Sequence, residues 1–364
     1  MIFKNASVFL ENRFETCDIA VESGKITALG PDLGEGVDCT GLRILPGLVD
    51  IHTHGCAGYD FDHANEDQLA EMSACYLRHG VTAVLATLMT NPRELLLEAA
   101  ARCGSAPAPI RGIYLEGPFF GPAKKGAHDA RYLSPIDGHF FAALDEAAGG
   151  NIRIVAVDPC LEGAETFIRE VSQTKRVTLA HTPATYDDAQ KGFAAGATQV
   201  THLFNAMTGL AHREPGLVGA ALAGDCLAEV ICDGIHIHPA VLKTAFKALD
   251  GRGMVISDSM AACGLADGAY SLGGQAVTVK GPRATLADGT LAGSVTFAWE
   301  GMVNLIRAGV PMGQAVAAAT AIPAKSAGLE DACGTLAVGR AADLVLCDSD
   351  WNIRQVYLAG DPVL

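Results

Sequence analysis

Two histidines separated by one residue follow an apolar run in the segment LPGLVDIHTHG, residues 45–55. Along an extended chain, residues i and i+2 point to the same side. His52 and His54 would therefore face one way if this segment is a strand. Two imidazoles on one side of a strand suit the binding of one divalent ion. An ordinary strand end that happens to carry histidines is the alternative, and the pair alone does not decide between the two.

Further histidines and acids follow other apolar runs along the chain. In a barrel enzyme the catalytic groups lie at the C-terminal ends of the strands. In chain order, the ends of the predicted strands carry His52, His54, Glu116, His181, His202, His236 and Asp258. Each of these could be a core histidine bonded to a carbonyl or a carboxylate at the start of a helix. As a set, they predict a metal site.

The elements that would position these residues are short apolar runs alternating with helical segments. Near-continuous runs such as residues 154–157 are typical of strands covered on both faces. The predicted strands are 48–52, 81–88, 110–116, 152–157, 177–181, 199–202, 227–232 and 254–257. Eight strand–helix units predict an α/β fold, a (β/α)8 TIM-type barrel. A doubly wound open sheet is the alternative, weakened because no GxGxxG opens a helix after the first strand.

The two ends of the chain differ from this central region. Residues 8–29 alternate apolar and polar residues around turns, which predicts hairpins, and residues 342–347 and 352–360 have the same character. We therefore predict a small β-sandwich domain built from both termini, residues 1–46 and 335–364, with the barrel inserted as residues 47–334. Residues 268–293 form a further β-rich excursion after the eighth strand.

Composition limits the classes of partner. A net charge of −15 argues against a nucleic-acid binder, although a few placed cations can still hold an anionic small substrate. The first ten residues lack the pattern of a signal peptide, and no segment approaches the roughly 20 apolar residues of a membrane span. The 11 cysteines include no CxxC pair, which indicates reduced and mostly buried thiols. These features predict a cytoplasmic protein that contacts neither nucleic acid nor membrane.

Several motifs together resemble the N-acetylglucosamine-6-phosphate deacetylases. They are PGLVDIHTHG at 46–55, LEGPF at 115–119, KGAH at 125–128, THLFNAM at 201–207, REPG at 213–216, DGIH at 233–236 and DGTLAGS at 288–294. The closing segment GTLAVGRAADLV at 334–345 resembles the wider amidohydrolase superfamily. The similarity extends over nearly the whole chain.

This resemblance implies a set of metal ligands. Glu116, His181 and His202 would hold one divalent ion, and His52 and His54 would bind a second ion bridged to the first through Glu116. Some members lack the HxH pair and use one metal, whereas this chain keeps it, so we expect capacity for two. Oxygen and nitrogen donors without thiolate fit zinc, iron(II), manganese or cobalt.

The resemblance also implies roles for residues that contact the substrate. Asp258 would be the general base, and His128, together with the metal, would stabilise the developing negative charge. His128 could equally be a solvated surface residue. His236 would bind sugar hydroxyls. The backbone of Asn205 and Ala206 would contact the substrate phosphate.

Arg213 is the remaining phosphate ligand that the resemblance suggests, because a guanidinium can grip phosphate oxygens at two points. In the family the equivalent arginine reaches across a dimer interface. We therefore expect a homodimer in which Arg213 serves the neighbouring site. A surface ion pair with Glu214 is the alternative.

These expectations favour hydrolysis of N-acetyl-D-glucosamine 6-phosphate to glucosamine 6-phosphate and acetate, a step of amino-sugar catabolism. The same chemistry on N-acetylgalactosamine 6-phosphate, which differs at one hydroxyl, is the nearest alternative. A cyclic-amide hydrolase is disfavoured because the bridging lysine expected there is replaced by Glu116. A non-catalytic scaffold is disfavoured because such proteins typically lose metal ligands, and every one is present here.

Overall fold

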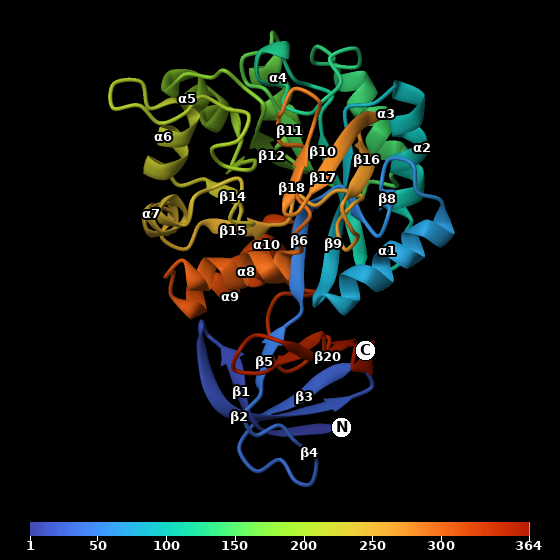
Figure 1. Cartoon of the computed structure of the whole chain (residues 1–364), viewed down its shortest axis with the longest axis vertical. Coiled ribbons are helices and arrows are strands. Elements are labelled where there is room, and N and C mark those ends of the chain that lie inside the picture. Colours follow the sequence, from blue (N-terminus) through green and yellow to red (C-terminus); the bar gives the residue numbers. More distant parts are fainter. Residues whose placement is uncertain (364) are drawn as a thin grey trace.

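The computed structural model describes residues 1–363, and its centre is a ring of eight parallel strands (Figure 1). Their spatial order is β15-β14-β13-β12-β11-β10-β9-β6. The strands are β6 Leu48–Thr53, β9 Val81–Met89, β10 Ile110–Glu116, β11 Ile152–Val157, β12 Arg176–Leu179, β13 Gln199–Val200, β14 Leu227–Ile231 and β15 Gly253–Ile256. Just beyond β15, Asp258 N donates to His52 O at 2.9 Å, which joins the last strand to the first. The predicted (β/α)8 barrel is confirmed.

Helices surround this ring, and the α-helices bury apolar residues against it or against one another. In α4 (Ala164–Val171), Ala164, Phe167, Ile168 and Val171 are buried, the spacing of a single apolar face. The other helices are α1 Glu66–Arg78, α2 Arg93–Gly104, η1 Pro122–Lys124, α3 Gly138–Ala147, α5 Tyr186–Ala195, α6 Gly216–Ala223, α7 Pro239–Leu249, α8 Ala298–Arg307, α9 Met312–Ala319 and α10 Ala321–Ser326. Among residues 1–363, none of these helices has both the length and the apolar character needed to cross a bilayer.

The barrel strands are buried on both faces, as their apolar runs predict. In β11, Ile154 and Ala156 belong to the cluster inside the ring, whereas Val155 and Val157 belong to the cluster shared with the helices. Alternate residues of a strand point to opposite faces, so continuous apolar runs are what such a strand requires. This packing leaves the ends of the strands as the place for polar side chains.

Both chain termini lie at the end of the barrel where β6 begins (Figure 1). Their strands form one sheet with its own apolar core, in the order β21-β20-β19-β5-β1-β2-β3, with β4 paired to β1. Leu45 of β5 pairs with Val345 of β19, so the N-terminal and C-terminal segments are joined. The strands are β1 Ile2–Leu10, β2 Arg13–Glu22, β3 Lys25–Gly30, β4 Val37–Asp38, β5 Arg43–Pro46, β19 Leu344–Cys347, β20 Ile353–Leu358 and β21 Asp361–Pro362. The small β unit built from both termini is therefore also confirmed.

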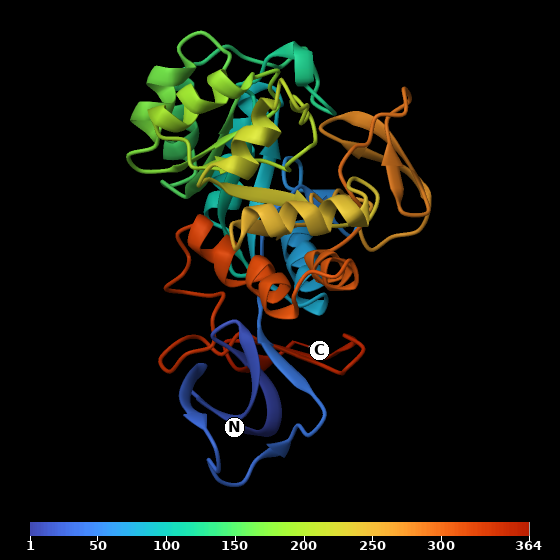
Figure 2. The same cartoon turned by 90° about the vertical axis from the view of Figure 1, so that its left-hand side faces the viewer.

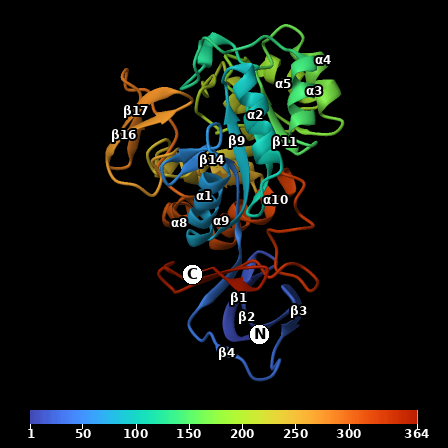
Figure 3. The ribbon, with the colours of Figure 1, turned by 90° about the vertical axis from the view of Figure 1, so that its right-hand side faces the viewer.

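The excursion after the eighth strand forms a three-stranded antiparallel sheet that projects from the side of the barrel (Figures 2 and 3). It consists of β16 Gly268–Leu272, β17 Gln275–Lys280 and β18 Arg283–Thr285. Leu272 and Val277 pack with Met89, at the C-terminal end of β9, and with Met260. A short hairpin, β7 Gly55–Cys56 with β8 Tyr59–Asp60, lies directly after the histidine pair. Both features border the C-terminal mouth of the barrel.

Candidate metal centre and active site

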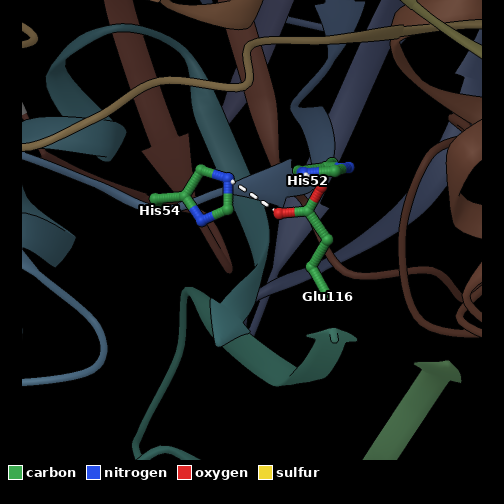
Figure 4. A group of neighbouring side chains, drawn as sticks. All are labelled: His52, His54 and Glu116. Atoms are coloured by element: carbon green, nitrogen blue, oxygen red, sulfur yellow. Dashed lines mark ion pairs between the residues drawn. The ribbon is translucent and has the colours of Figure 1, made fainter. Parts of the chain in front are cut away.

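The carboxylate of Glu116, the last residue of β10, lies at the centre of the site and is only 2% exposed. The Nε2 atoms of the four predicted ligand histidines surround its oxygens: those of His181 and His202 at 3.1 Å, His54 at 3.3 Å and His52 at 3.6 Å. Figure 4 shows His52 and His54 on two sides of the carboxylate. The structure thus brings together five residues that the sequence places at the ends of four different strands.

Two groups of these residues have the spacing of a metal site. The ligand atoms of His52, His54 and Glu116 lie within 4.8 Å of one another, and so do those of Glu116, His181 and His202. Glu116 belongs to both groups. Each group could hold a metal ion.

The charge balance of the site also fits divalent ions. His52 Nε2 is buried and has no hydrogen-bond partner among residues 1–363. Within the same range, the ion-pair partners of the buried carboxylates Glu116, Glu229 and Asp258 are all histidines, with no lysine or arginine within 4.0 Å. Buried carboxylates are costly unless they are paired or coordinate a metal. Ions here would supply both the missing positive charge and a partner for the free nitrogen.

Unusual backbone conformations aim three of the side chains into the mouth of the barrel. His181, His202 and Asp258 have φ values of +46°, +26° and +49°. This left-handed region is uncommon for residues other than glycine and costs about 1–3 kcal/mol per residue. The left-handed turns at His181 and His202 also end β12 at Leu179 and β13 at Val200, in each case two residues before the predicted strand end.

Hydrogen bonds at the far side of two rings fix their orientation. His181 Nδ1 donates to the carbonyl oxygen of Lys124 at 2.9 Å, and His52 Nδ1 lies 2.8 Å from Glu229 Oε2. A protonated Nδ1 leaves the lone pair on Nε2, which is the atom that faces Glu116. Phe120 stacks on the His181 ring, with 4.7 Å between ring centroids.

Sequence reasoning missed Glu229 and the carbonyl of Lys124. An acid inside the apolar strand LAEVI is a signal that could have identified Glu229. A main-chain carbonyl has no such signal, because every residue carries one.

A cavity of about 550 Å³ opens above these residues. Its lining includes four of the predicted ligands, His54, Glu116, His181 and His202, while His52 lies buried beneath it. Of the other predicted site residues, all but Arg213 line the cavity: His128, Asn205, Ala206, His236 and Asp258. Leu272 and Leu291, both from the excursion at residues 268–293, also line the cavity. The cavity is large enough for a small polar ligand.

Comparison with known proteins agrees with this geometry. The model of the amidohydrolase family matches residues 43–363. The chain belongs to the amidohydrolase family. As a member, this amidohydrolase is a metal-dependent hydrolase of amide bonds.

Individual relatives cover nearly the whole amidohydrolase chain. The N-acetylglucosamine-6-phosphate deacetylase of Bacillus subtilis (strain 168) is 35% identical over 383 residues, covering 99% of this chain and 96% of the relative. The N-acetylgalactosamine-6-phosphate deacetylase of Escherichia coli O157:H7 is 34% identical over 354 residues, covering 94% and 93%.

A solved structure of a deacetylase is also similar to this chain over its whole length. The N-acetyl-D-glucosamine-6-phosphate deacetylase of Mycobacterium smegmatis, solved as a mutant in complex with N-acetyl-D-glucosamine-6-phosphate, superposes with a TM-score of 0.95 at 31% identity. The superposition covers 100% of this chain and 99% of the Mycobacterium smegmatis chain. The amidohydrolase therefore groups with the amino-sugar-phosphate deacetylases.

Electrostatics within the amidohydrolase site keep its acids ionised. Burial alone would raise the pKa of Asp258, but the hydrogen bond from His54 Nε2, 3.1 Å away, and the charge of His52 lower it below the ordinary value. Burial and the neighbouring His128 lower the pKa of His181 to about 4. At neutral pH the site thus offers an ionised Asp258 and a neutral His181.

The His128 ring has a hydrogen bond that selects its tautomer. The backbone N–H of Thr90 donates to His128 Nδ1 at 3.4 Å, so the proton of the neutral ring lies on Nε2. Nε2 lies 3.6 Å from Glu116 Oε2, and His128 is only 1% exposed. The surface alternative for His128 is therefore excluded.

The phosphate ligands predicted for the amidohydrolase do not all line the cavity. Asn205 N donates to His202 O at 2.9 Å, so this N–H is already used. The N–H of Ala206 donates to no acceptor among residues 1–363. Arg213 is exposed, does not line the cavity and forms no ion pair with Glu214 within the described residues. A single chain therefore leaves Arg213 outside its own site.

Proposed function

We propose that this amidohydrolase removes the acetyl group of N-acetyl-D-glucosamine 6-phosphate, giving D-glucosamine 6-phosphate and acetate, in amino-sugar catabolism. The carrying observation is the convergence of the Nε2 atoms of His52, His54, His181 and His202 on Glu116, which lines a cavity together with Asp258. Relatives named for this reaction cover nearly the whole chain. The substrate is thus taken from the relatives, and the chemistry from the site.

Glu116, His181 and His202 would hold one divalent ion, and His52 and His54 would hold a second one with Glu116. The nitrogen and oxygen donors suit zinc, iron(II), manganese or cobalt. A bound ion of this kind polarises a carbonyl and lowers the pKa of a coordinated water to about 7.

Asp258 would move the proton during the reaction. Its ionised carboxylate accepts a proton from the attacking water and returns it to the nitrogen of the leaving amine. His128 would donate its Nε2–H to the carbonyl oxygen as negative charge develops there. Both residues line the same cavity, so one bound acetamide can contact both.

His236 would bind sugar hydroxyls, since Asp233 Oδ2, 2.7 Å from its Nδ1, leaves Nε2 for the ligand. Ala206, with Asn205 beside it, would contact the phosphate through the backbone. Arg213 would complete the phosphate site of a second copy in a homodimer. Its exposure and its distance from the cavity of its own chain support this arrangement.

A second candidate substrate is N-acetylgalactosamine 6-phosphate. The relative from Escherichia coli O157:H7 that is named for this sugar is 34% identical, close to the value for the glucosamine-specific relatives. The two sugars differ at one hydroxyl, so a single polar contact decides between them.

We further propose that residues 1–46 and 335–364 form one domain and residues 47–334 the other, with the β5–β19 pairing as support. A cytoplasmic location is proposed because all 11 cysteines are free thiols, as a reducing compartment would keep them.

Acetate release from the two 6-phosphosugars and from unphosphorylated N-acetylglucosamine tests the function. We expect kcat/KM to be highest for N-acetylglucosamine 6-phosphate and much lower for the unphosphorylated sugar. A preference for the galacto epimer would select the second candidate, and a preference for the unphosphorylated sugar would refute both.

A further inference from the structure

We propose that Glu229 is the positioning residue that makes His52 a metal ligand and so creates the second ion site. This inference rests on the two-ion part of the proposed function. Glu229 lies in the middle of β14, is fully buried and does not line the cavity. It can act on an ion only through another residue, and that residue is His52, 2.8 Å away.

The hydrogen bonds around Glu229 require it to be an acceptor. Gln199 Nε2 donates to Oε1 at 2.5 Å, and the backbone N–H of His202 approaches Oε2 at 3.4 Å. The Gln199 amide is oriented in turn by Ser326, whose hydroxyl donates to Gln199 Oε1. With every neighbour donating, the carboxylate offers Oε2 as an acceptor for His52 Nδ1–H.

This arrangement decides which nitrogen of His52 is free. With the proton on Nδ1, the lone pair of Nε2 points toward Glu116 Oε1, 3.6 Å away. His54 has no equivalent support, because its Nδ1 is buried without a partner among residues 1–363. Of the two histidines in the HxH pair, only His52 is therefore held by a carboxylate at Nδ1, the nitrogen that faces away from the ion site, in the described part of the chain.

The buried charge of Glu229 gives a second, independent reason to expect that this residue supports an ion at His52. Glu229 is 0% exposed, and His52 is its only ion-pair partner among residues 1–363. A buried carboxylate without a cation is strongly unfavourable. An ion bound at His52 Nε2 would make the ring a better donor to Glu229 and would compensate its charge. Carboxylates that support metal-bound histidines in this way typically contribute 10–100-fold to metal affinity.

The test measures Zn²⁺ content per chain after dialysis against a graded series of chelator concentrations. Wild-type protein is expected to hold two ions. Glu229→Gln is expected to keep the ion at Glu116, His181 and His202 and to bind the other 10–100-fold more weakly. Gln199 and His52 approach different oxygens of Glu229, and a glutamine offers an acceptor at only one of these two positions. Glu229→Asp, which withdraws the carboxylate by one methylene, is expected to weaken the same ion.

Two control variants separate this effect from a general loss of structure. Asp343→Asn removes a buried carboxylate beside the terminal sheet and is expected to keep both ions at wild-type affinity. His52→Asn removes the ligand itself and is expected to lose the second ion. Retention of the ion at Glu116, His181 and His202 in Glu229→Gln is expected to show that this variant is folded.

Two ions at wild-type affinity in Glu229→Gln would overturn the inference. A single ion per wild-type chain would overturn it together with the two-ion proposal. Two ions in the wild type without hydrolysis of either 6-phosphosugar would refute the proposed function and leave the role of Glu229 supported.

Discussion

The backbone N–H of Asp258 donates a 2.9 Å hydrogen bond to the carbonyl oxygen of His52. This bond lies where the eighth strand of the barrel meets the first. It holds Asp258 Oδ1 at 3.6 Å from His52 Nε2 and 3.1 Å from His54 Nε2. The closure of the barrel and the geometry of the proposed base therefore depend on the same contact.

Replacing Asp258 by Asn is expected to lower kcat by at least the 10²–10⁴-fold typical of general acid–base catalysis. An amide has no lone pair that can take a proton from water at neutral pH, whereas the volume of the side chain is unchanged. Acetate release measures the rate, and metal analysis of the same sample is expected to match wild type. Retained turnover with bound metal would remove Asp258 from this role.

Removing the metal is expected to abolish activity and to lower the thermal midpoint of unfolding. Glu116, Glu229 and Asp258 have only histidine partners within 4.0 Å in residues 1–363, so bound metal would compensate the repulsion among these carboxylates. A ligand at 100 times its dissociation constant stabilises the folded state by about 2.7 kcal/mol. Calorimetry before and after chelation, and after addition of Zn²⁺, provides the measurement. Equal midpoints in all three samples would contradict a metal site.

Much of the fold and of the site is readable from the sequence, for physical reasons. Strands covered on both faces must be apolar, so residues 154–157 identify β11, and the polar residue that ends such a run must lie at the rim, as Glu116 does. The actual ends of β12 and β13 were not readable. They depend on left-handed turns at His181 and His202 that the surrounding structure imposes. Main-chain acceptors such as Lys124 O likewise could not be predicted, because every residue has a carbonyl oxygen whatever its type.

Substituting Arg213 by Ala is expected to lower kcat/KM for the phosphorylated sugar about 10- to 100-fold, the equivalent of a charge-assisted hydrogen bond of about 1.5–3 kcal/mol. The loss is expected mainly in KM, because the proposed contact of Arg213 is with the phosphate, a part of the substrate remote from the reacting amide. Kinetics with the unphosphorylated sugar are expected to be unchanged and serve as the control.

Mixing the Arg213→Ala and Asp258→Asn proteins tests whether sites are shared. A hybrid dimer would contain one site with an intact Asp258 and an intact Arg213 from the other chain. Activity is therefore expected to exceed that of either variant alone after subunit exchange. No gain in hybrids verified by size and mass would show that Arg213 serves its own chain or none.

Asp343 is expected to make stability depend on pH. Burial raises the pKa of its carboxyl above the ordinary value, opposed by the 2.8 Å hydrogen bond from Ala359 N, and Oδ2 has no partner within the described chain. Because the folded-state pKa is raised, its contribution to stability is present below the unfolded-state pKa of about 3.9 and is lost as pH rises through the folded-state pKa. The Asp343→Asn variant has no carboxyl group at this position, so it does not lose stability in this way as the pH rises.

The free energy of unfolding of metal-free protein in urea, measured from pH 4 to pH 7, checks this prediction. We expect the difference between Asp343→Asn and wild type to grow in favour of the variant as pH rises. A difference that is constant over this range, or that grows in favour of wild type, would contradict the raised pKa.

The left-handed turns at His181, His202 and Asp258 have a consequence for how the enzyme acquires its ions. These conformations persist only because the barrel around them is already packed. The imidazoles are thus gathered around Glu116 as soon as the chain has folded, so arriving ions need no rearrangement of the strands. We expect uptake by metal-free protein to be governed by diffusion into the 550 Å³ cavity and by release of the hydration shell, and to be complete long before a global unfolding event could occur.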